Sequence, residues 1–281
     1  MLKKIDFARS FLEKHQDQFH CPVCREVVQL KDYSLICQNN HQFDLSKKGT
    51  IYFLSHSIQT EYNKKMLVHR GNMIQSGMYQ ELLEKMIGII PLMGNTLDVG
   101  CGEGSFLLEL SKLGLSGSKI GFDISKDGIY LASNQEVEAF WCVADLTNLP
   151  FADQSMDTIL NIFSPSHYQE FQRVLKKEGT VIKVIPETNY LKELRAAFYP
   201  EDEAKQHYSN EKVLTKFSNE MDILVNERVT FTFAIPKENQ LDLLEMSPLE
   251  WGATEQIKEK LQKNPLTDIT IDVRMLKGKV K

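Results

Sequence analysis

Short apolar runs that end at glycines or acids mark the middle of the chain. Residues 97–104, LDVGCGEG, pass from an apolar stretch into a glycine-rich turn, and a helical pattern follows. The next two apolar runs, 119–124 and 139–144, carry acids at their ends, Asp123 and Asp145. A strand, a glycine turn and a helix, with an acid about 20 residues further on, is how doubly wound sheets hold nucleoside cofactors. The pattern therefore predicts an α/β fold with a Rossmann-like sheet.

The same periodicities predict elements on both sides of this segment. They are helices over 59–90 (broken at Ser76-Gly77), 168–175 and 189–197, strands over 33–36, 158–163 and 180–185, a turn at 176–179, and a closing hairpin of 229–234 with 269–275. The residues ahead of Cys21 also have a helical pattern, with Phe7, Phe11 and Leu12 on one face. Ligands of doubly wound sheets bind beyond the carboxyl ends of strands, so we expect the segment 164–167 to face the ligand.

Composition is that of an ordinary globular protein. The 281 residues suit one large domain or a medium domain with a small one, and 42% are hydrophobic and 25% charged. No apolar run approaches the roughly 20 residues of a membrane span, and the amino-terminal stretch is too polar for a secretory signal. We expect a cytoplasmic protein without membrane contact.

The charge distribution argues mildly against a protein that coats nucleic acid, because 33 bases and 38 acids give a net charge of −5. Residues 1–50 nevertheless carry eight Lys or Arg and six Asp or Glu. Pairs of basic residues follow closely, at Lys47-Lys48, Lys64-Lys65 and His69-Arg70. These charges either solvate a surface or form a small basic patch.

The spacing of the glycines narrows the choice of cofactor. A dinucleotide fingerprint reads G-x-G-x-x-G and places a pyrophosphate at the helix N-terminus. Here Gly100, Gly102 and Gly104 alternate with Cys101 and Glu103, and a phosphate beside Glu103 would meet a like charge. The turn therefore favours a cationic ligand over a phosphate.

A second motif lies near the amino terminus, where Cys21, Cys24, Cys37 and His41 have the spacing C-x2-C-x12-C-x3-H. Two tight pairs of this kind make the closed tetrahedral site of structural zinc. A module this small buries little core, so metal binding would supply much of its folding energy. The five cysteines of the chain fit reduced thiols and a metal site better than disulfides. We expect a zinc-binding domain over 1–55 and a second domain over 56–281.

Together the two motifs resemble those of the 23S ribosomal RNA (guanine-N1)-methyltransferase family, in which a small zinc domain precedes a class I methyltransferase domain. The likeness runs from about residue 20 to about residue 255. Its segments are CPVC and HQFD around the metal ligands, Gly77-x-Tyr79, DVGCGEG, LPFADQSMD over 149–157 and MSPLEW over 246–251. The knuckle joined to the glycine turn is specific to the family, whereas LPFADQSMD also occurs in methyltransferases of small molecules.

The resemblance implies S-adenosylmethionine as the cofactor, a molecule with an ammonium and a sulfonium and no phosphate. It places Asp98 and Glu103 near the methionine end, Asp123 at the ribose and Asp145 at the adenine amino group. Further cofactor-binding positions are implied at Tyr79, Gly100, Gly102, Gly104 and Tyr190. Tyr190 departs from the pattern, because it stands where other members have a histidine.

The implied reaction is methyl transfer to N1 of one guanine in a hairpin loop of 23S ribosomal RNA, near the macrolide-binding tunnel, with the zinc domain assisting recognition. The family also suggests a homodimer. Guanine N1 carries a proton at neutral pH, so the reaction needs a proton acceptor. His167, Asp145 and Glu187 are the candidates by position.

Two other interpretations of the protein's function stay open. One is a methyltransferase that acts on a small molecule, which the acidic balance and the LPFADQSMD segment favour. The other is a non-catalytic module that uses the knuckle to bind RNA or protein. Phe163, Tyr168 and Trp251 are aromatic residues that either stack on an exposed base or pack in the core.

Overall fold

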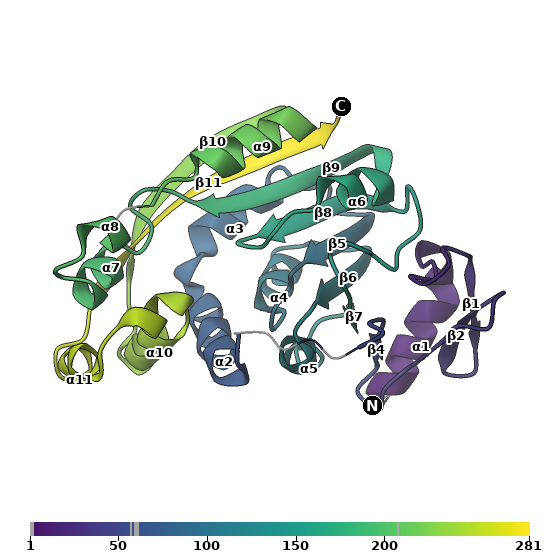
Figure 1. Cartoon of the computed structure of the whole chain (residues 1–281), viewed down its shortest axis with the longest axis horizontal. Coiled ribbons are helices and arrows are strands. Elements are labelled where there is room, and N and C mark those ends of the chain that lie inside the picture. Colours follow the sequence, from purple (N-terminus) through teal and green to yellow (C-terminus); the bar gives the residue numbers. More distant parts are fainter. Residues whose placement is uncertain (1–2, 57, 59–61, 207) are drawn as a thin grey trace.

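The computed structural model describes residues 3–56, 58, 62–206 and 208–281. Its centre is a sheet whose described strands follow the order β10-β11-β9-β8-β5-β6-β7-β4 (Figure 1). The strands are Thr50–Tyr52 (β4), Asn95–Val99 (β5), Ser118–Asp123 (β6), Phe140–Val143 (β7), Met156–Ile162 (β8), Leu175–Pro186 (β9), Met221–Ala234 (β10) and Asp268–Val280 (β11). In this sheet β11 runs antiparallel to both of its neighbours, and the other pairs are parallel.

Helices cover both faces of the sheet. Successive side chains of a buried strand point to opposite sides, so both faces have to be covered. In β8, Ile159 packs in one layer of the core and Leu160 in the other. The first layer contains residues of α1 (Lys4–His15), α6 (Tyr168–Val174) and α9 (Glu211–Glu220). The second contains residues of α2 (Lys64–Met73), α3 (Gln80–Ile87), α4 (Ser105–Lys112), α5 (Lys126–Ala132), α7 (Lys192–Phe198), α10 (Gln240–Glu245) and α11 (Glu255–Lys263). A short helix, α8 (Glu203–Gln206), follows α7.

The predicted α/β fold is confirmed, and the strands predicted between residues 97 and 185 correspond to β5 to β9. The predicted pairing of 229–234 with 269–275 is part of the longer β10–β11 ladder. The prediction of a turn at 176–179 is wrong, because these residues lie within β9. The pairing of β8 with β9 shifts register between Met156 and Thr158, so β9 continues through an irregular stretch.

The helical segment predicted over 59–90 corresponds to α2 and α3, and its residues 59–61 lie outside the described residues. The predicted break at Ser76-Gly77 falls in a π-helical turn, Ile74–Met78. Gly77 has a φ of +93° there, a conformation that glycine adopts readily.

The amino-terminal module shares its core with the central sheet. It contains a three-stranded sheet of β1 (Val28–Lys31), β2 (Ser34–Cys37) and β3 (Gln42–Asp44), and β4 then joins the central sheet beside β7 (Figure 1). In α1, Leu12 is fully buried, and the Phe11 ring stacks on Phe140 of β7 at 5.4 Å. A boundary at residue 55 would therefore separate segments that pack together.

The loop between β7 and β8 also contacts this module. His20 N donates a hydrogen bond to Pro150 O at 3.1 Å. Arg25 donates to Leu149 O at 2.9 Å, and its guanidinium lies 3.7 Å from the buried Glu170 carboxylate. The LPFA part of the LPFADQSMD segment, residues 149–152, is thus the surface on which the module docks. No helix in the described part of the chain is long and apolar enough to cross a membrane.

Candidate metal centre and cofactor site

The four predicted metal ligands lie together, with their ligand atoms within 4.8 Å of one another. Cys24 Sγ and Cys37 Sγ are 3.7 Å apart, and His41 Nδ1 lies 3.4 Å from Cys37 Sγ and 3.5 Å from Cys21 Sγ. An ion at ordinary Zn–S and Zn–N distances would give tetrahedron edges of about 3.8 and 3.6 Å. These residues therefore fit a closed zinc site.

Local backbone turns bring the two ligand pairs together. Arg25 N donates to Cys21 O at 2.8 Å, and Asn40 N donates to Cys37 O at 2.9 Å. Arg25 and Asn40 have φ angles of +63° and +61°. These left-handed residues reverse the chain directly after Cys24 and directly before His41.

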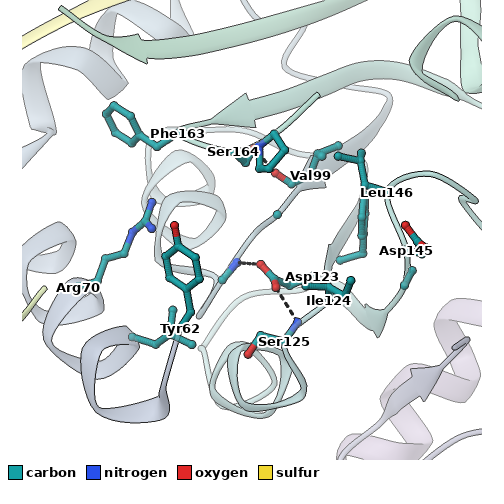
Figure 2. A pocket seen from close by; sticks show the side chains of 16 residues that line it. Tyr62, Arg70, Val99, Asp123, Ile124, Ser125, Asp145, Leu146, Phe163 and Ser164 are labelled. Carbon is teal, nitrogen blue, oxygen red and sulfur yellow. Dashed lines mark hydrogen bonds between the residues drawn. The ribbon is translucent and has the colours of Figure 1, made fainter. Parts of the chain in front are cut away.

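The carboxyl ends of β5, β6, β7 and β8 enclose a cavity of about 260 Å³. The walls include Val99 and Gly100 at the end of β5, Asp123–Ser125 at the end of β6, Ala144–Leu146 after β7, Phe163–Pro165 after β8, and Arg70 of α2 (Figure 2). The glycine turn and the acids at the two strand ends thus meet at one edge of the sheet.

Two acids line this cavity, and neighbouring donors hold their carboxylates in place. Asp123 accepts hydrogen bonds from Gly102 N at 2.9 Å and from Ser125 N at 2.7 Å (Figure 2). Asp145 accepts from Thr147 N and Thr147 Oγ1, each at 2.8 Å. Burial raises the pKa of Asp123, although its amide donors oppose that rise. Each carboxylate retains lone pairs for the hydroxyl or amino groups of a nucleoside.

Asp98 is a buried acid that, unlike Asp123 and Asp145, does not line the cavity, and one of its acceptors is unused among the described residues. Its side chain is 2% exposed, and Oδ2 has no hydrogen-bond partner among the described residues. Burial, followed by the charges of Glu103 and Asp123, raises the pKa of Asp98 to about 7, and Arg70 opposes this shift. A buried acceptor without a donor is unfavourable, so the site suits a ligand that brings a cationic donor. This is the chemistry of the methionine ammonium.

Glu103 lies behind the cavity and does not line it. The residue borders a separate cavity of about 210 Å³, and burial raises the pKa of its carboxyl group, with Arg70 opposing. Burial alone would lower the pKa of Arg70, but Glu103, Tyr79 and Tyr190 outweigh that effect and raise it. Arg70 is thus a charged group that Glu103 stabilises in the cavity wall.

The glycines of the turn have different roles. Gly100 and Gly102, with φ angles of +66° and +55°, line the cavity. Gly104 faces the core, where a Cβ would lie 2.7 Å from the ring of Trp141. Its absence of a side chain serves helix–sheet packing rather than contact with a ligand.

A second cavity, of about 520 Å³, adjoins the first, and Tyr62, Arg70 and Phe163 line both. The predicted cofactor residues Tyr79 and Tyr190 line this second cavity. Their hydroxyl groups are 2.5 Å apart, and the Phe163 ring stacks on Tyr190 at 5.3 Å.

A network of hydrogen bonds fixes the loop after β8. Asn161 donates to Ser164 Oγ at 2.5 Å and to Pro165 O at 2.8 Å. Lys183 of β9 donates to Asn161 Oδ1 at 2.5 Å and to Ser166 Oγ at 2.7 Å. Burial, together with the nearby Lys216, lowers the pKa of Lys183 to about 8.

The remaining candidates lie outside both cavities. His167 caps α6, and its Nδ1 accepts a hydrogen bond from Glu170 N at 3.3 Å. Glu187 pairs with Arg274. Tyr168 is 4% exposed and belongs to the core, whereas Trp251 is 46% exposed and contacts Tyr62.

Sequence reasoning did not select Arg70 as a ligand-binding residue. Its signal is a cation on the buried stripe of α2, between Met66, Leu67 and Met73. Tyr62 also lines the cavity without having been singled out, whereas Ser164 and Pro165 belong to the segment 164–167 that was expected to face the ligand.

Comparisons with known proteins agree with this geometry. The family model described as "RlmA, N-terminal", a zinc ribbon, matches residues 19–55, and the model "Methyltransferase domain" matches residues 97–183. YxjB of Bacillus subtilis (strain 168), whose name assigns it to the 23S rRNA (guanine-N1)-methyltransferases, is 36% identical over 272 residues. The match covers 92% of this chain and 96% of that relative.

Two further comparisons are more distant. The 23S rRNA (guanine(748)-N(1))-methyltransferase of Streptomyces fradiae is 28% identical over 182 residues, which cover 62% of this chain and 65% of that relative. The solved structure of the YcgJ protein from Bacillus subtilis has 20% identity and a TM-score of 0.46, and covers 72% of this chain and 99% of that one.

The match to YxjB extends over both the zinc module and the cofactor sheet. The protein is thus a methyltransferase that uses S-adenosylmethionine and holds a structural zinc. It belongs to the 23S rRNA (guanine-N1)-methyltransferase family.

Proposed function

We propose that the enzyme methylates N1 of one guanine in a hairpin loop of 23S ribosomal RNA. The observation that carries this proposal is the pair of cavities with a common wall of Tyr62, Arg70 and Phe163. The first offers carboxylates to a nucleoside cofactor, and the second offers aromatic rings on which an extruded base can stack. A base in the second cavity would face the cofactor cavity across this wall.

In the cofactor cavity we assign Asp123 to the ribose hydroxyls and Asp145 to the adenine amino group. We assign Asp98, which is buried and does not line the cavity, to the methionine ammonium because its Oδ2 has no partner among the described residues. Asp145 and Arg70 lie on opposite sides of Asp123 in Figure 2, which agrees with adenine at one end and the reacting group at the other. When bound, S-adenosylmethionine supplies an electrophilic methyl group. The positive φ of Gly100 lets the backbone approach it closely.

The proton of guanine N1 must leave during methylation, and none of the three predicted acceptors is well placed in this arrangement. Glu187 pairs with Arg274 and lines neither cavity. Asp145 would be occupied at the adenine end of the cavity. His167 Nδ1 accepts from Glu170 N, so in the neutral ring Nε2 carries the hydrogen and is a donor. We therefore assign Asp145 to cofactor binding, and we assign His167 the structural role of capping α6. Catalysis then rests chiefly on orientation of the base.

A basic patch beside the cavities suits the RNA backbone. Lys48 of the zinc module and Lys64 of α2 both place their ammonium groups over the Tyr130 ring, at 5.2 and 5.0 Å. Lys126 lies one turn from Tyr130 on α5 and is exposed. We infer that this patch of Lys48, Lys64 and Lys126 is where the zinc module assists RNA binding.

The test is incubation with labelled cofactor and fragments of 23S ribosomal RNA, followed by nuclease digestion and mass spectrometry. We expect N1-methylguanosine from one position, which reverse transcription locates because a methyl group at N1 blocks base pairing. Asp123→Ala is the matched inactive control. No methylated guanine in any fragment would contradict the proposal.

The alternative of a small-molecule acceptor loses one of its supports. Residues 149–152, the LPFA part of the LPFADQSMD segment that favours it, form the docking surface for the zinc module, which explains them without reference to a substrate. Turnover of small acceptors with no incorporation into RNA would restore this alternative. Calorimetry without any cofactor binding would instead favour a non-catalytic module.

A further inference from the structure

Arg195 is a buried cation that has no counter-ion among the residues that the structure describes. Its side chain is on α7 and the residue is 6% exposed, yet its guanidinium donates no hydrogen bond to any residue that the structure describes, and Nε is completely buried. Its recorded contact is with the Tyr208 ring, whose centroid lies 5.3 Å from Cζ. Burial lowers the pKa of Arg195, and the phenols of Tyr190 and Tyr208 offset only part of this effect.

The described residues around Arg195 in the second cavity do not include an acidic side chain that could pair with it. Arg195 lines this cavity, and the described residues around the cavity include several tyrosines but no Asp or Glu. Ser247, which follows α10, also lines this cavity, and its Oγ is buried without a hydrogen-bond partner among the described residues. Unpaired buried donors are costly, so their presence around an open cavity indicates a ligand that brings hydrogen-bond acceptors.

We propose that Arg195 binds O6 and N7 of the target guanine and thereby selects guanine over adenine. The proposal rests on the proposed function and deepens it. These two acceptors match the fork of a guanidinium, whereas adenine presents an amino donor in place of O6. A base held by O6 and N7 leaves N1 free to face the wall that Arg70 and Phe163 share with the cofactor cavity.

Burial decides between the base and a phosphate as the partner of Arg195. Phosphates of a nucleotide extruded from a loop stay near solvent, where the exposed Lys205 lines the same cavity. Arg195 is buried and lies over the Tyr208 ring, in a cavity whose other aromatic residues suit stacking of a base. A phosphate contact is the competing outcome of the test.

The experiment compares ordinary transcripts of a 23S ribosomal RNA fragment with transcripts in which 7-deazaguanine replaces guanine. This change removes the N7 acceptor and leaves Watson–Crick pairing intact. For the unaltered enzyme, we expect kcat/KM to fall about tenfold on the 7-deazaguanine RNA, the loss of one charge-assisted hydrogen bond. Equal rates on the two RNAs would overturn the N7 contact without any variant.

Arg195→Met should lose about tenfold to hundredfold on ordinary RNA and should no longer distinguish the two RNAs. Lys205→Met is the matched control, and we expect it to keep the full penalty for 7-deazaguanine. If the losses from Arg195→Met and 7-deazaguanine multiply, or if Arg195→Met is fully active, the proposal is wrong. A multiplying loss with a weaker salt dependence would assign Arg195 to a phosphate.

Two controls separate folding and the proposed function from this inference. Cofactor affinity and the melting temperature of Arg195→Met show whether the fold survives, and the comparison of the two RNAs on the unaltered enzyme stands even if it does not. If the unaltered enzyme produces no N1-methylguanosine on ordinary RNA, the proposed function fails. If it methylates both RNAs equally, only the role of Arg195 fails.

Discussion

Asp123 connects the glycine turn with the next strand, since one carboxylate accepts from both Gly102 N and Ser125 N. Its replacement would therefore remove the proposed ribose contact and also release two backbone amides that shape the cavity. Arg70 also has two kinds of neighbour. The charge of Glu103 stabilises its protonated form, and its side chain lines both cavities. At this scale, function depends on groups that are held by the fold before any ligand arrives.

Asp123→Ala should weaken cofactor binding by about tenfold to hundredfold, because hydrogen bonds to a charged group are lost. Isothermal calorimetry with S-adenosylmethionine measures the effect. Asp127→Ala is the control, since Asp127 is an exposed acid on the adjoining helix. Unchanged affinity in Asp123→Ala would refute the assignment of Asp123 to the ribose.

Cofactor affinity should depend on pH through Asp98, whose pKa of about 7 is raised by burial, Glu103 and Asp123 and opposed by Arg70. The cationic ammonium requires the carboxylate form, so affinity is complete above pH 7 and falls below it by up to about tenfold per pH unit. Titrations across this range measure the slope. Asp98→Asn should bind weakly and lose most of the slope; an unchanged slope would mean that another group titrates.

Lys183→Met should lower kcat more than it raises KM for RNA. The change removes the charged donor of Asn161 Oδ1 and leaves it only the hydrogen bond from Ser166 Oγ, at a cost of about 1.5–3 kcal/mol, and loosens the loop that carries Ser164. Single-turnover kinetics separate the two effects. Lys177→Met, on an exposed position of the same strand, should have neither. A pure KM effect would show that Lys183 does not position the loop.

Among the elements, the cofactor strands could be predicted from sequence because local signals define them: apolar runs, glycines and terminal acids. The second cavity could not, because its walls combine residues from α2, α7 and the segment around Ser247, far apart in the chain. Arg70 and Arg195 show what signal remained, a cation on the apolar stripe of a helix. In α7, Arg195 stands among Leu191, Leu194 and Phe198, all buried.

The pairing of the edge strand β4 with β7 was also beyond sequence reasoning. Three residues carry too weak a periodicity to reveal which sheet they join. The β7–β8 loop was recognised as a motif common to methyltransferases, but its contact with Arg25 depends on tertiary structure.

Loss of zinc should affect the cofactor site as well as the module. Cys37→Ser removes a ligand and should lower the melting temperature, because metal binding contributes folding energy. It should also weaken binding of S-adenosylmethionine, since β4 of the module pairs with β7. Calorimetry and thermal scans with and without a chelator measure both. Val23→Ser, an exposed change within the knuckle, is the control, and cofactor affinity that survives full loss of zinc would contradict the coupling.

At the scale of the whole molecule, an acidic protein must bind a polyanion, and the patch of Lys48, Lys64 and Lys126 offers a local solution. Lys48→Gln with Lys64→Gln should raise KM for RNA and reduce the dependence of log K on log salt by about 2. Filter binding over a range of salt concentrations gives this slope. Lys263→Gln with Lys177→Gln removes the same charge from exposed positions elsewhere, and an identical effect from that pair would mean that the patch has no special role.

The pairing of β4 with β7 has a consequence for how the newly made enzyme becomes active. Phe53 N donates to Val143 O at 2.9 Å, and two residues later Asp145 enters the wall of the cofactor cavity. A newly made polypeptide in a zinc-starved cell would thus complete neither its metal knuckle nor the rim that holds its methyl donor. Zinc binding would thus be required before the enzyme becomes active. Only fully assembled molecules would then methylate the RNA.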